Sequence, residues 1–366
     1  MSQNTRLIAF NLPQFHPIPE NNKIWGEGFT EWRNVMKGKP LFKNHYQPHY
    51  PKDLGFYDMR VPETRLAQAE MAQKYGIDGF CYYHYWFNGK LLLERPTQEI
   101  LKSKEPNFPF CFCWANESWS KRWLGEDTDV FVQQKYSEED HIAHAKYLSN
   151  FFKDDRYIKV NNQPVFAIYR PSDIPNIEKT IEIFREICLK ETGMDLFLIG
   201  SNSHEWDTNV LLEYGFDAVL SFRPQLGVLP YSFTDQPILK RLLRNIKNFS
   251  VINSSLRLYD YAEAIEIMKI VEPESFDKIM PTVFLGWDNT ARKGDSAIVI
   301  SGNTPELFLK ELNRVHQKLQ KAKENNGIIF INAWNEWAEG CHLEPDMKNE
   351  YSYLEAIRKF KDSTNE

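Results

Sequence analysis

Two glutamates three residues apart, Glu336 and Glu339, are the side chains of this sequence best suited to acid–base chemistry. They lie in the segment Asn-Ala-Trp-Asn-Glu-Trp-Ala-Glu-Gly, which ends at Gly340. Apolar neighbours raise the pKa of a carboxyl group, and a second carboxylate close by raises it further. One glutamate could then donate a proton at neutral pH while the other accepts one. The same spacing also fits a plainer interpretation, an acidic pair that caps a helix start.

Further acids and amides lie beside tryptophans elsewhere in the chain. Trp114-Ala115-Asn116-Glu117 repeats the aromatic–Asn–Glu theme, Glu205 follows His204, and Asp288 follows Trp287. Each of these acids could equally serve as a hydrogen-bonding residue of a loop. The candidate substrate-binding residues are Trp86, His84, Lys90, Trp114, Asn116, Glu117, His204, Glu205, Trp287, Asp288, Trp334, Asn335 and Trp337, with Glu31 as a weaker candidate.

Strand alternation divides the run Tyr82-Tyr83-His84-Tyr85-Trp86 between two faces, because successive side chains of a strand point in opposite directions. Alternate members of this run can belong to the core. We expect His84, Trp86 and the following Lys90 to face a cleft.

Eight nearly continuous apolar runs are typical of parallel strands that are buried on both faces. An amphipathic segment follows each run, and several of these segments begin with proline or an acidic first turn, as helices do. The predicted strands are 7–12, 79–85, 109–114, 164–169, 196–201, 218–222, 280–285 and 328–333, and the predicted helices are 62–75, 96–102, 138–152, 177–191, 208–214, 259–270, 305–323 and 351–360.

This alternation predicts an α/β fold, a (β/α)8 TIM barrel in a single domain over residues 1–366. A doubly wound sheet also alternates strand and helix, but its first strand usually leads into a glycine-rich turn that is missing here. Two long insertions, 16–61 and 225–258, follow strands. Both should therefore lie on the face where the active sites of barrels form.

All ten tryptophans fall at or just after the carboxyl end of a predicted strand. Concentration at one rim predicts a cleft with flat apolar walls, and such walls suit the C–H faces of sugar rings. The alternative is that tryptophan only stabilises the long loops.

Composition restricts the remaining possibilities. The 366 residues carry a net charge of −6, which argues against nucleic acid or anionic lipid as a partner. No apolar run approaches the roughly 20 residues of a transmembrane segment, and the amino terminus has no signal-peptide core. Five cysteines, an odd number, predict free thiols and a cytoplasmic protein.

No cofactor or metal is expected from the motifs. The sequence has no phosphate loop, no H-E-x-x-H and no nucleophile elbow. Asp127-Thr128-Asp129 matches the short D-x-D pattern that binds a metal and a sugar nucleotide in many glycosyltransferases. In an acidic loop such a match more often arises by chance.

Three motifs together carry a family resemblance. The segment from Trp334 to Gly340 with the following Glu344-Pro345, the segment from Trp114 to Glu117, and Gly286-Trp287-Asp288-Asn289-Thr290 resemble the WbsX-like proteins of bacterial polysaccharide gene clusters. That group is related to glycoside hydrolase family 99, the endo-α-mannosidases. The resemblance implies a (β/α)8 barrel and cleavage of α-mannosidic bonds with retention. It assigns Glu336 as the base on the sugar 2-hydroxyl, which gives a 1,2-anhydro intermediate, and Glu339 as the acid/base for the leaving group.

Three functions are compatible with these features. The first is a glycosidase-type enzyme, a hydrolase or transglycosylase, that acts on mannose-type oligo- or polysaccharides in the metabolism of O-antigen or capsule. The second is a glycosyltransferase of lipopolysaccharide biosynthesis with an activated sugar donor. The third is a non-catalytic glycan-binding barrel, which the pair of glutamates disfavours.

Overall fold

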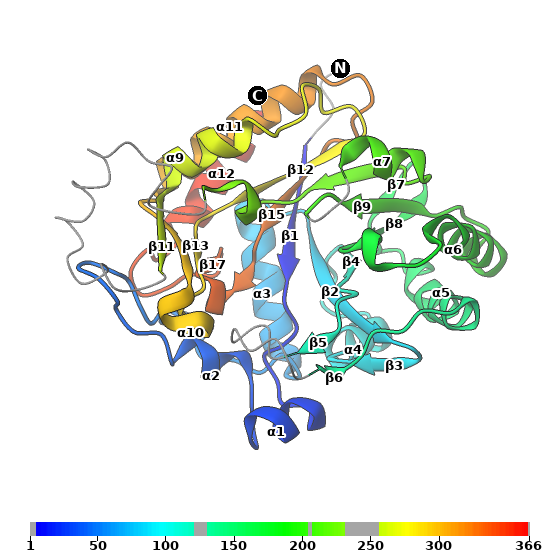
Figure 1. Ribbon diagram of the computed structural model, residues 1–366, viewed down its shortest axis with the longest axis horizontal. Helices are drawn as coiled ribbons and strands as arrows, with labels where there is room; N and C mark the ends of the chain where they lie inside the picture. The colour runs from blue at the N-terminus through cyan, green and yellow to red at the C-terminus, as the bar shows by residue number, and fades with distance from the viewer. Residues whose placement is uncertain (1–4, 121–129, 204–206, 231–255, 365–366) are drawn as a thin grey trace.

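Eight parallel strands close into a barrel in the computed structural model, which describes residues 5–120, 130–203, 207–230 and 256–364 (Figure 1). The order around the barrel is β1-β15-β12-β10-β9-β8-β4-β2, and β2 pairs with β1 to complete the ring. The predicted TIM barrel is thus confirmed. Its strands are β1 (Arg6–Asn11), β2 (Gly79–Phe87), β4 (Phe110–Trp114), β8 (Gln163–Ile168), β9 (Phe197–Ser201), β10 (Ala218–Ser221), β12 (Ile279–Phe284) and β15 (Ile328–Asn332).

Helices connect successive strands around the outside of the barrel (Figure 1). They are α3 (Pro62–Tyr75), α4 (Arg95–Ser103), α5 (Glu138–Phe152), α6 (Ile177–Thr192), α7 (Thr208–Glu213), α9 (Tyr261–Lys269), α11 (Pro305–Lys321) and α12 (Ser352–Thr364). Among the described residues, none of the helices has the length and apolar character needed to cross a bilayer. All five cysteines are buried and unpaired.

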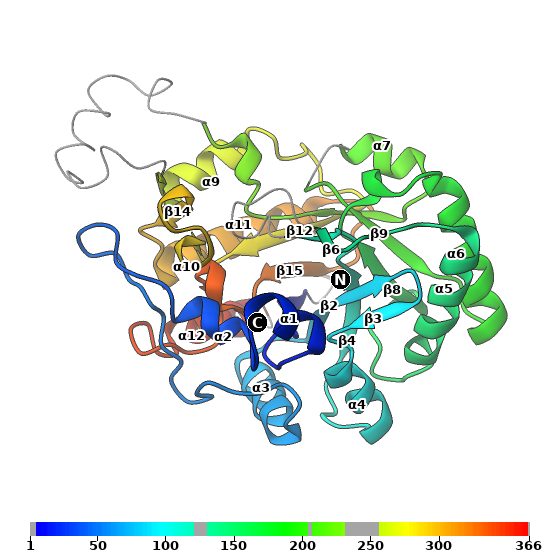
Figure 2. The ribbon, with the colours of Figure 1, turned by 60° about the horizontal axis from the view of Figure 1, so that its bottom comes forward.

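Shorter elements fall in the connections, and α1 and α2 of the first long loop come forward in Figure 2. The helical ones are α1 (Pro19–Trp25), α2 (Glu31–Val35), α10 (Thr290–Lys293) and the 3-10 turns η2 (Pro171–Asp173), η3 (Leu226–Val228), η5 (Gly294–Ser296) and η6 (Trp337–Glu339). The short strands are β3 (Lys90–Leu92), β5 (Trp119–Ser120), β6 (Val130–Val132), β7 (Lys159–Val160), β11 (Arg257–Asp260), β13 (Trp287–Asp288), β14 (Ile298–Ser301), β16 (Asn335–Glu336) and β17 (Cys341–His342).

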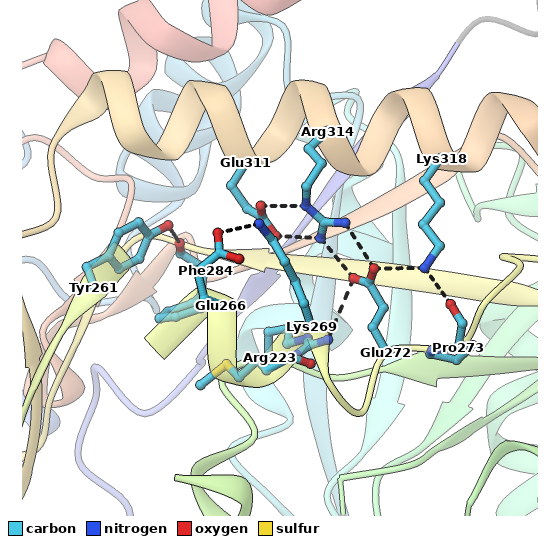
Figure 3. Close-up of polar contacts among 11 residues, drawn as sticks. Arg223, Tyr261, Glu266, Lys269, Glu272, Pro273, Phe284, Glu311, Arg314 and Lys318 are labelled. Atoms are coloured by element: carbon cyan, nitrogen blue, oxygen red, sulfur yellow. Dashed lines mark hydrogen bonds and ion pairs between the residues drawn. The ribbon is translucent and has the colours of Figure 1, made fainter. Parts of the chain in front are cut away.

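A network of ion pairs links α11 to the segment between α9 and β12 (Figure 3). The Glu272 carboxylate accepts two hydrogen bonds from Arg314, at 2.8 and 2.9 Å, and one from Lys318 at 2.8 Å. Arg223, at the carboxyl end of β10, lies 3.7 Å from the same carboxylate. Burial alone would raise the pKa of Glu272, but the hydrogen bonds from Arg314 and Lys318 hold it below its usual value. The ionised carboxylate therefore stabilises the contact between helix and barrel.

Glu272→Gln should lower the free energy of unfolding at pH 7 by about 2 kcal/mol. This is less than a fully buried pair would lose, because Arg314 and Lys318 are about one quarter exposed. The pKa of Glu272 is lower in the folded than in the unfolded protein. Its carboxylate therefore stabilises the folded state at pH values above the unfolded pKa of roughly 4.3, and this contribution disappears as the pH falls through the folded pKa. The difference between variant and wild type in urea unfolding should therefore shrink under acidic conditions.

The matched control is Glu266→Gln, which removes one partner of the exposed pair between Glu266 and Lys269. Its effect should stay below about 0.5 kcal/mol. Equal effects of the two variants would show that the network contributes no more than a surface ion pair.

Candidate active site

A cleft of about 370 Å³ opens among the loops at the carboxyl ends of the barrel strands, the face on which barrel enzymes carry their active sites. Both predicted acid–base residues, Glu336 and Glu339, line it. The other lining residues are Tyr83, Tyr85, Ala115, Glu117, Trp119, Tyr169, Ser203, Phe222, Pro224, Leu226, Gly227, Trp287, Asn289, Arg292 and Lys293.

The two glutamates are held in a tight hairpin directly after β15. Strands β16 and β17 pair antiparallel, with Glu336 opposite Cys341, and the 3-10 turn between them carries Glu339. Gly340 ends this turn with a φ of 60°. A Cβ there would lie 2.9 Å from the Cβ of Asp288, so both the left-handed conformation and the close approach require glycine. The hairpin is therefore pressed against the connection that follows β12.

One buried guanidinium, Arg292, contacts three carboxylates at the edge of the cleft. Its nitrogens lie 2.6 Å from Glu31 Oε1, 2.6 Å from Glu339 Oε1 and 3.5 Å from Glu336 Oε2. The side chains of Arg292 and Glu31 are 4% and 1% exposed. Because Arg292, Glu31 and Glu336 are shielded from water, their mutual interactions are strong, whereas Glu339 is 20% exposed toward the cleft.

Both glutamates of the hairpin have raised pKa values. Burial raises the pKa of Glu336 well above its usual range, and the nearby Glu339 raises it further, while Arg292 acts in the opposite direction. Burial also raises the pKa of Glu339, whose short ion pair with Arg292 favours the charged form. The cleft therefore holds two carboxyl groups whose protonated forms are favoured relative to those of ordinary surface glutamates.

Aromatic rings from several strands pave the floor of the cleft. Tyr83 stacks on Phe10 at 5.4 Å between ring centroids and meets Tyr169 edge-on at 6.5 Å. Phe222 packs edge-on against Tyr169 at 5.4 Å and lies 5.5 Å from Phe10. The ring faces and edges lie in the same cleft as several acids and the Asn289 amide, the combination that suits a sugar ring.

The expectation that His84 and Trp86 face the cleft is wrong. Both side chains point outward from β2 against α5, where His84 Nε2 lies 2.9 Å from His144 Nε2 and the Trp86 ring stacks on His144 at 4.6 Å. The Trp86 indole donates to Asp140 at 2.9 Å. Trp114 lies in the same outer layer, 4.7 Å from the His144 ring. The opposite members of the strand, Tyr83 and Tyr85, face the cleft instead.

Several other predicted binding residues support loops and do not line the cleft. Lys90 forms an ion pair with Glu20 at 2.5 Å. The Asn116 amide accepts from the backbone N–H of Arg170 and donates to its carbonyl, both at 2.8 Å, so it links the connections that follow β4 and β8. Neither residue is part of the lining of the cleft.

Trp334, Asn335 and Trp337, the neighbours of the two glutamates in the sequence, hold the hairpin in place from the side that faces away from the cleft. Asn335 accepts from the backbone N–H of Leu12 at 2.7 Å and donates to its carbonyl at 3.0 Å. The Trp337 indole donates to the buried Glu344 carboxylate at 2.6 Å. Trp334 is fully buried and packs on Phe80 at 5.1 Å. Trp334, Asn335 and Trp337 are therefore supports of the site and not its lining.

The remaining predicted residues divide between the cleft and other places. Trp287 and Glu117 line the cleft, and Glu117 accepts from Arg170 at 2.8 Å. Asp288 points the other way, toward His45 at 2.6 Å and Gln47 at 2.8 Å. His204, Glu205 and the Asp127-Thr128-Asp129 pattern lie outside the described residues.

Sequence reasoning missed Arg292 and undervalued Glu31, Tyr83 and Tyr85. Arg292 stands four residues after the quoted Asp288, in a stretch that contains no recognisable catalytic pattern. Its only local signal is a basic residue close to an aromatic-rich strand end, which is too common to be specific. The three carboxylates that it contacts are brought to it by the fold.

Comparison with known proteins gives the family. A family model described as "Glycosyltransferase WbsX" matches residues 7–357. The chain belongs to the WbsX family. The WbsX chain is also 37% identical over 354 residues to the uncharacterized protein WxcX of two Xanthomonas campestris pv. campestris strains, B100 and ATCC 33913. The match covers 96% of this chain and 49% of those proteins, so the chain spans about half the length of the curated relatives it matches.

Solved structures with the same fold include the GH99 endo-α-mannosidase of Bacteroides thetaiotaomicron. It is 15% identical, with a TM-score of 0.58 in its complex with bis-tris-propane, and the alignment covers 98% of this chain and 97% of the enzyme. A glycoside hydrolase-like protein gives a TM-score of 0.59 at 14% identity, with 98% and 95% of the two chains covered. The WbsX chain thus shares a barrel fold with glycoside hydrolases.

Arg292→Met should destabilise the protein by about 3–5 kcal/mol at pH 8, because a buried cation is removed from three carboxylates. Without the cation the pKa values of Glu336 and Glu339 rise further above their unfolded values. Carboxyl groups with a raised folded-state pKa stabilise the folded protein at pH values below their unfolded pKa. This contribution disappears as the pH rises through their folded-state pKa. Denaturant unfolding should therefore show a smaller loss at pH 5 than at pH 8.

Lys293→Met provides the control, because this neighbouring cation also lines the cleft but is exposed. It should change stability little at either pH. A loss in Arg292→Met that is independent of pH would contradict the charge argument and indicate that only packing has been lost.

Proposed function

We propose that this WbsX chain is a carbohydrate-active enzyme that acts on α-linked, mannose-type glycans through Glu336 and Glu339. The reaction is of the glycosidase type, hydrolysis or transglycosylation, and serves the metabolism of bacterial cell-surface polysaccharide. The observation that carries the proposal is the pair of carboxyl groups with raised pKa values in one cleft, of which Glu336 is buried and Glu339 partly exposed. Most glycosidases use such a pair around the bond that they cleave.

The aromatic floor supports a sugar as the substrate. Tyr83, Tyr169 and Phe222 offer ring faces next to the two glutamates, and Tyr83 and Tyr169 also carry hydroxyl groups. Ser203 and Asn289 add small polar groups on other walls of the same cleft. A pyranose could stack on the rings and place its hydroxyl groups against these polar side chains.

The division of labour follows the resemblance, with Glu336 as the base on the 2-hydroxyl and Glu339 as the acid for the leaving group. In the free protein Arg292 holds Glu339 at 2.6 Å and favours its charged form. The acid role therefore requires the glycosidic oxygen to approach Glu339 in competition with this ion pair. The amides of Asn335 and Asn116 bond to Leu12 and Arg170 and leave Glu336 without a hydrogen bond from either of them.

Glu336→Gln should lower turnover by about 100-fold or more on every substrate, because the base is needed whatever group departs. Glu339→Gln should abolish cleavage of natural glycans yet keep much of the activity on aryl α-mannosides with good leaving groups. Such groups depart without protonation. The measurement is kcat on a series of aryl α-mannosides of decreasing leaving-group pKa, together with an oligosaccharide.

The control for this pair is Glu117→Gln, which removes a carboxylate of the same cleft without changing the hairpin. It should affect KM more than kcat. If Glu336→Gln spared the substrates with good leaving groups and Glu339→Gln affected every substrate, the two roles would be interchanged. Full activity in both variants would refute the glycosidase mechanism.

A second candidate function, transfer from an activated sugar donor, is supported by the description of the family as glycosyltransferases. A donor diphosphate would need a cation; the exposed Lys293 lines the cleft, whereas Arg292 is already paired with three carboxylates. Incubating the protein with a panel of nucleotide sugars and with α-mannosides separates the two. Release of nucleotide that depends on an acceptor would support transfer, and product formation from α-mannosides alone supports the glycosidase-type reaction.

A further inference from the structure

Two buried histidines face each other beside the β16–β17 hairpin, and neither lines the cleft that holds Glu336 and Glu339. His49 comes from the first long loop and His342 from β17, and His49 Nδ1 lies 2.7 Å from His342 Nε2. Asp346 completes the group, with Oδ2 3.8 Å from His342 Nε2. The potential ligand atoms of the three residues all lie within 4.8 Å of one another, and all three side chains are buried.

The hydrogen bonds fix which nitrogen of His342 is free to coordinate. Its Nδ1 lies 2.9 Å from the carbonyl oxygen of Glu344, which can only accept, so Nδ1 carries the hydrogen. In the neutral ring the lone pair is then on Nε2, which points at His49 and Asp346. In the metal-free protein His49 Nδ1 donates to this lone pair. Metal binding therefore requires the His49 hydrogen to move to Nε2.

Asp346 is a buried carboxylate with incomplete charge compensation. Its Oδ1 accepts from the backbone N–H groups of Lys348 at 2.8 Å and Asn349 at 2.5 Å, and Oδ2 accepts from the Asn349 amide at 3.0 Å. In the described part of the chain, no lysine or arginine nitrogen lies within 4 Å of this carboxylate. Buried charges are normally paired or coordinate a metal, and here the neighbours are two neutral imidazoles.

We propose that His49 Nδ1, His342 Nε2 and Asp346 Oδ2 bind one divalent transition-metal ion of the Zn²⁺ class. Two imidazoles and a carboxylate are a ligand set typical of Zn²⁺ and related first-row ions. Two Zn–N bonds of about 2.0–2.1 Å at a tetrahedral angle separate the nitrogens by roughly 3.3 Å. The two rings must then move apart by roughly 0.6 Å. Asp346 Oδ2 must approach His342 Nε2 by roughly 0.5 Å and His49 Nδ1 by up to roughly 1.5 Å.

The surroundings of the three ligands fit a metal centre. His49 stacks on Tyr46 at 4.3 Å and His342 on Trp337 at 3.7 Å, so both rings are held in place by aromatic neighbours. A cavity of about 330 Å³ borders all three ligands and leaves room for water or another oxygen ligand at a fourth position. The glutamate pair belongs to a different cavity, so this site does not depend on the proposed function.

The ion would join the first long loop to the hairpin that carries Glu336 and Glu339. His342 and Asp346 are four residues apart, but His49 lies 293 positions before His342, and therefore no spacing motif could reveal the complete set. His342 lies opposite Asn335 in the β16–β17 pair and stacks on Trp337. Metal binding would thus stabilise the support of the catalytic hairpin.

The test uses the untagged full chain, stripped with EDTA, desalted and then loaded with ZnCl2. Elemental analysis after removal of excess metal should find about one equivalent of Zn²⁺ per chain, and loading should raise Tm. Co²⁺ in place of Zn²⁺ should give visible d–d absorption typical of tetrahedral or five-coordinate sites. His49→Ala and Asp346→Asn should each lower the affinity by more than roughly 100-fold, beyond the usual cost of losing an outer partner.

Asp346→Asn should preserve the local fold, because its amide oxygen can accept the same backbone hydrogen bonds. A loss of metal affinity in this variant then reports on the ligand and not on unfolding. The matched control is His316→Ala, which removes an imidazole that bonds to Thr5 in another part of the barrel and should bind metal as the wild type does. Substoichiometric binding by the wild type, or binding by His49→Ala equal to that of the control, would overturn the proposal. In that case the two imidazoles share a proton.

Discussion

A single guanidinium, that of Arg292, determines how the loops of this barrel close around its cleft. Glu31 arrives from α2, Arg292 from α10, and Glu336 and Glu339 from the turn after β15, so one contact joins three connections. One cation cannot neutralise three carboxylates, and an uncompensated charge in a protected site is costly. Burial is the main cause of the raised pKa values of Glu336 and Glu339, and the neighbouring carboxylates raise them further. The arrangement that closes the loops therefore also keeps an exchangeable proton in the cleft.

The supporting contacts behind the cleft use polar groups that carry no chemistry themselves. Glu344 accepts hydrogen bonds from the Trp337 indole, the Tyr57 hydroxyl and the Gln68 amide at 2.6, 2.8 and 2.7 Å. Gln68 belongs to α3, so this carboxylate connects the outer helix layer to the turn that carries Glu339. Buried hydrogen-bond networks of this kind restrict the rotamers of the residues that they hold.

The sequence predicted the barrel well and the site only in part. Each barrel strand is a short apolar run that lies between recognisable helices, and such local signals survive in a single sequence. Glu336 and Glu339 were found because they are neighbours in the chain, whereas Arg292 and Glu31 meet only through the closure of distant loops. The orientation of β2 could not be predicted, because a strand buried on both faces shows no alternation of polar and apolar residues. His84 and Tyr83 look equally suitable in such a strand.

The tryptophans show why a correct observation about position led to an incomplete conclusion about function. Trp119 and Trp287 line the cleft. Other indoles donate to acceptors in the surrounding layers: Trp32 to the Tyr57 carbonyl, Trp86 to Asp140, Trp114 to the Trp86 carbonyl and Trp337 to Glu344. A large ring that buries apolar area while its N–H reaches a carbonyl or carboxylate is well suited to fasten a loop. The long loops lie at the carboxyl ends of the strands. Tryptophans that hold loops in place therefore occur at the same rim as tryptophans that would bind a ligand. Position along the chain cannot separate the two uses, because the direction of each side chain decides between them.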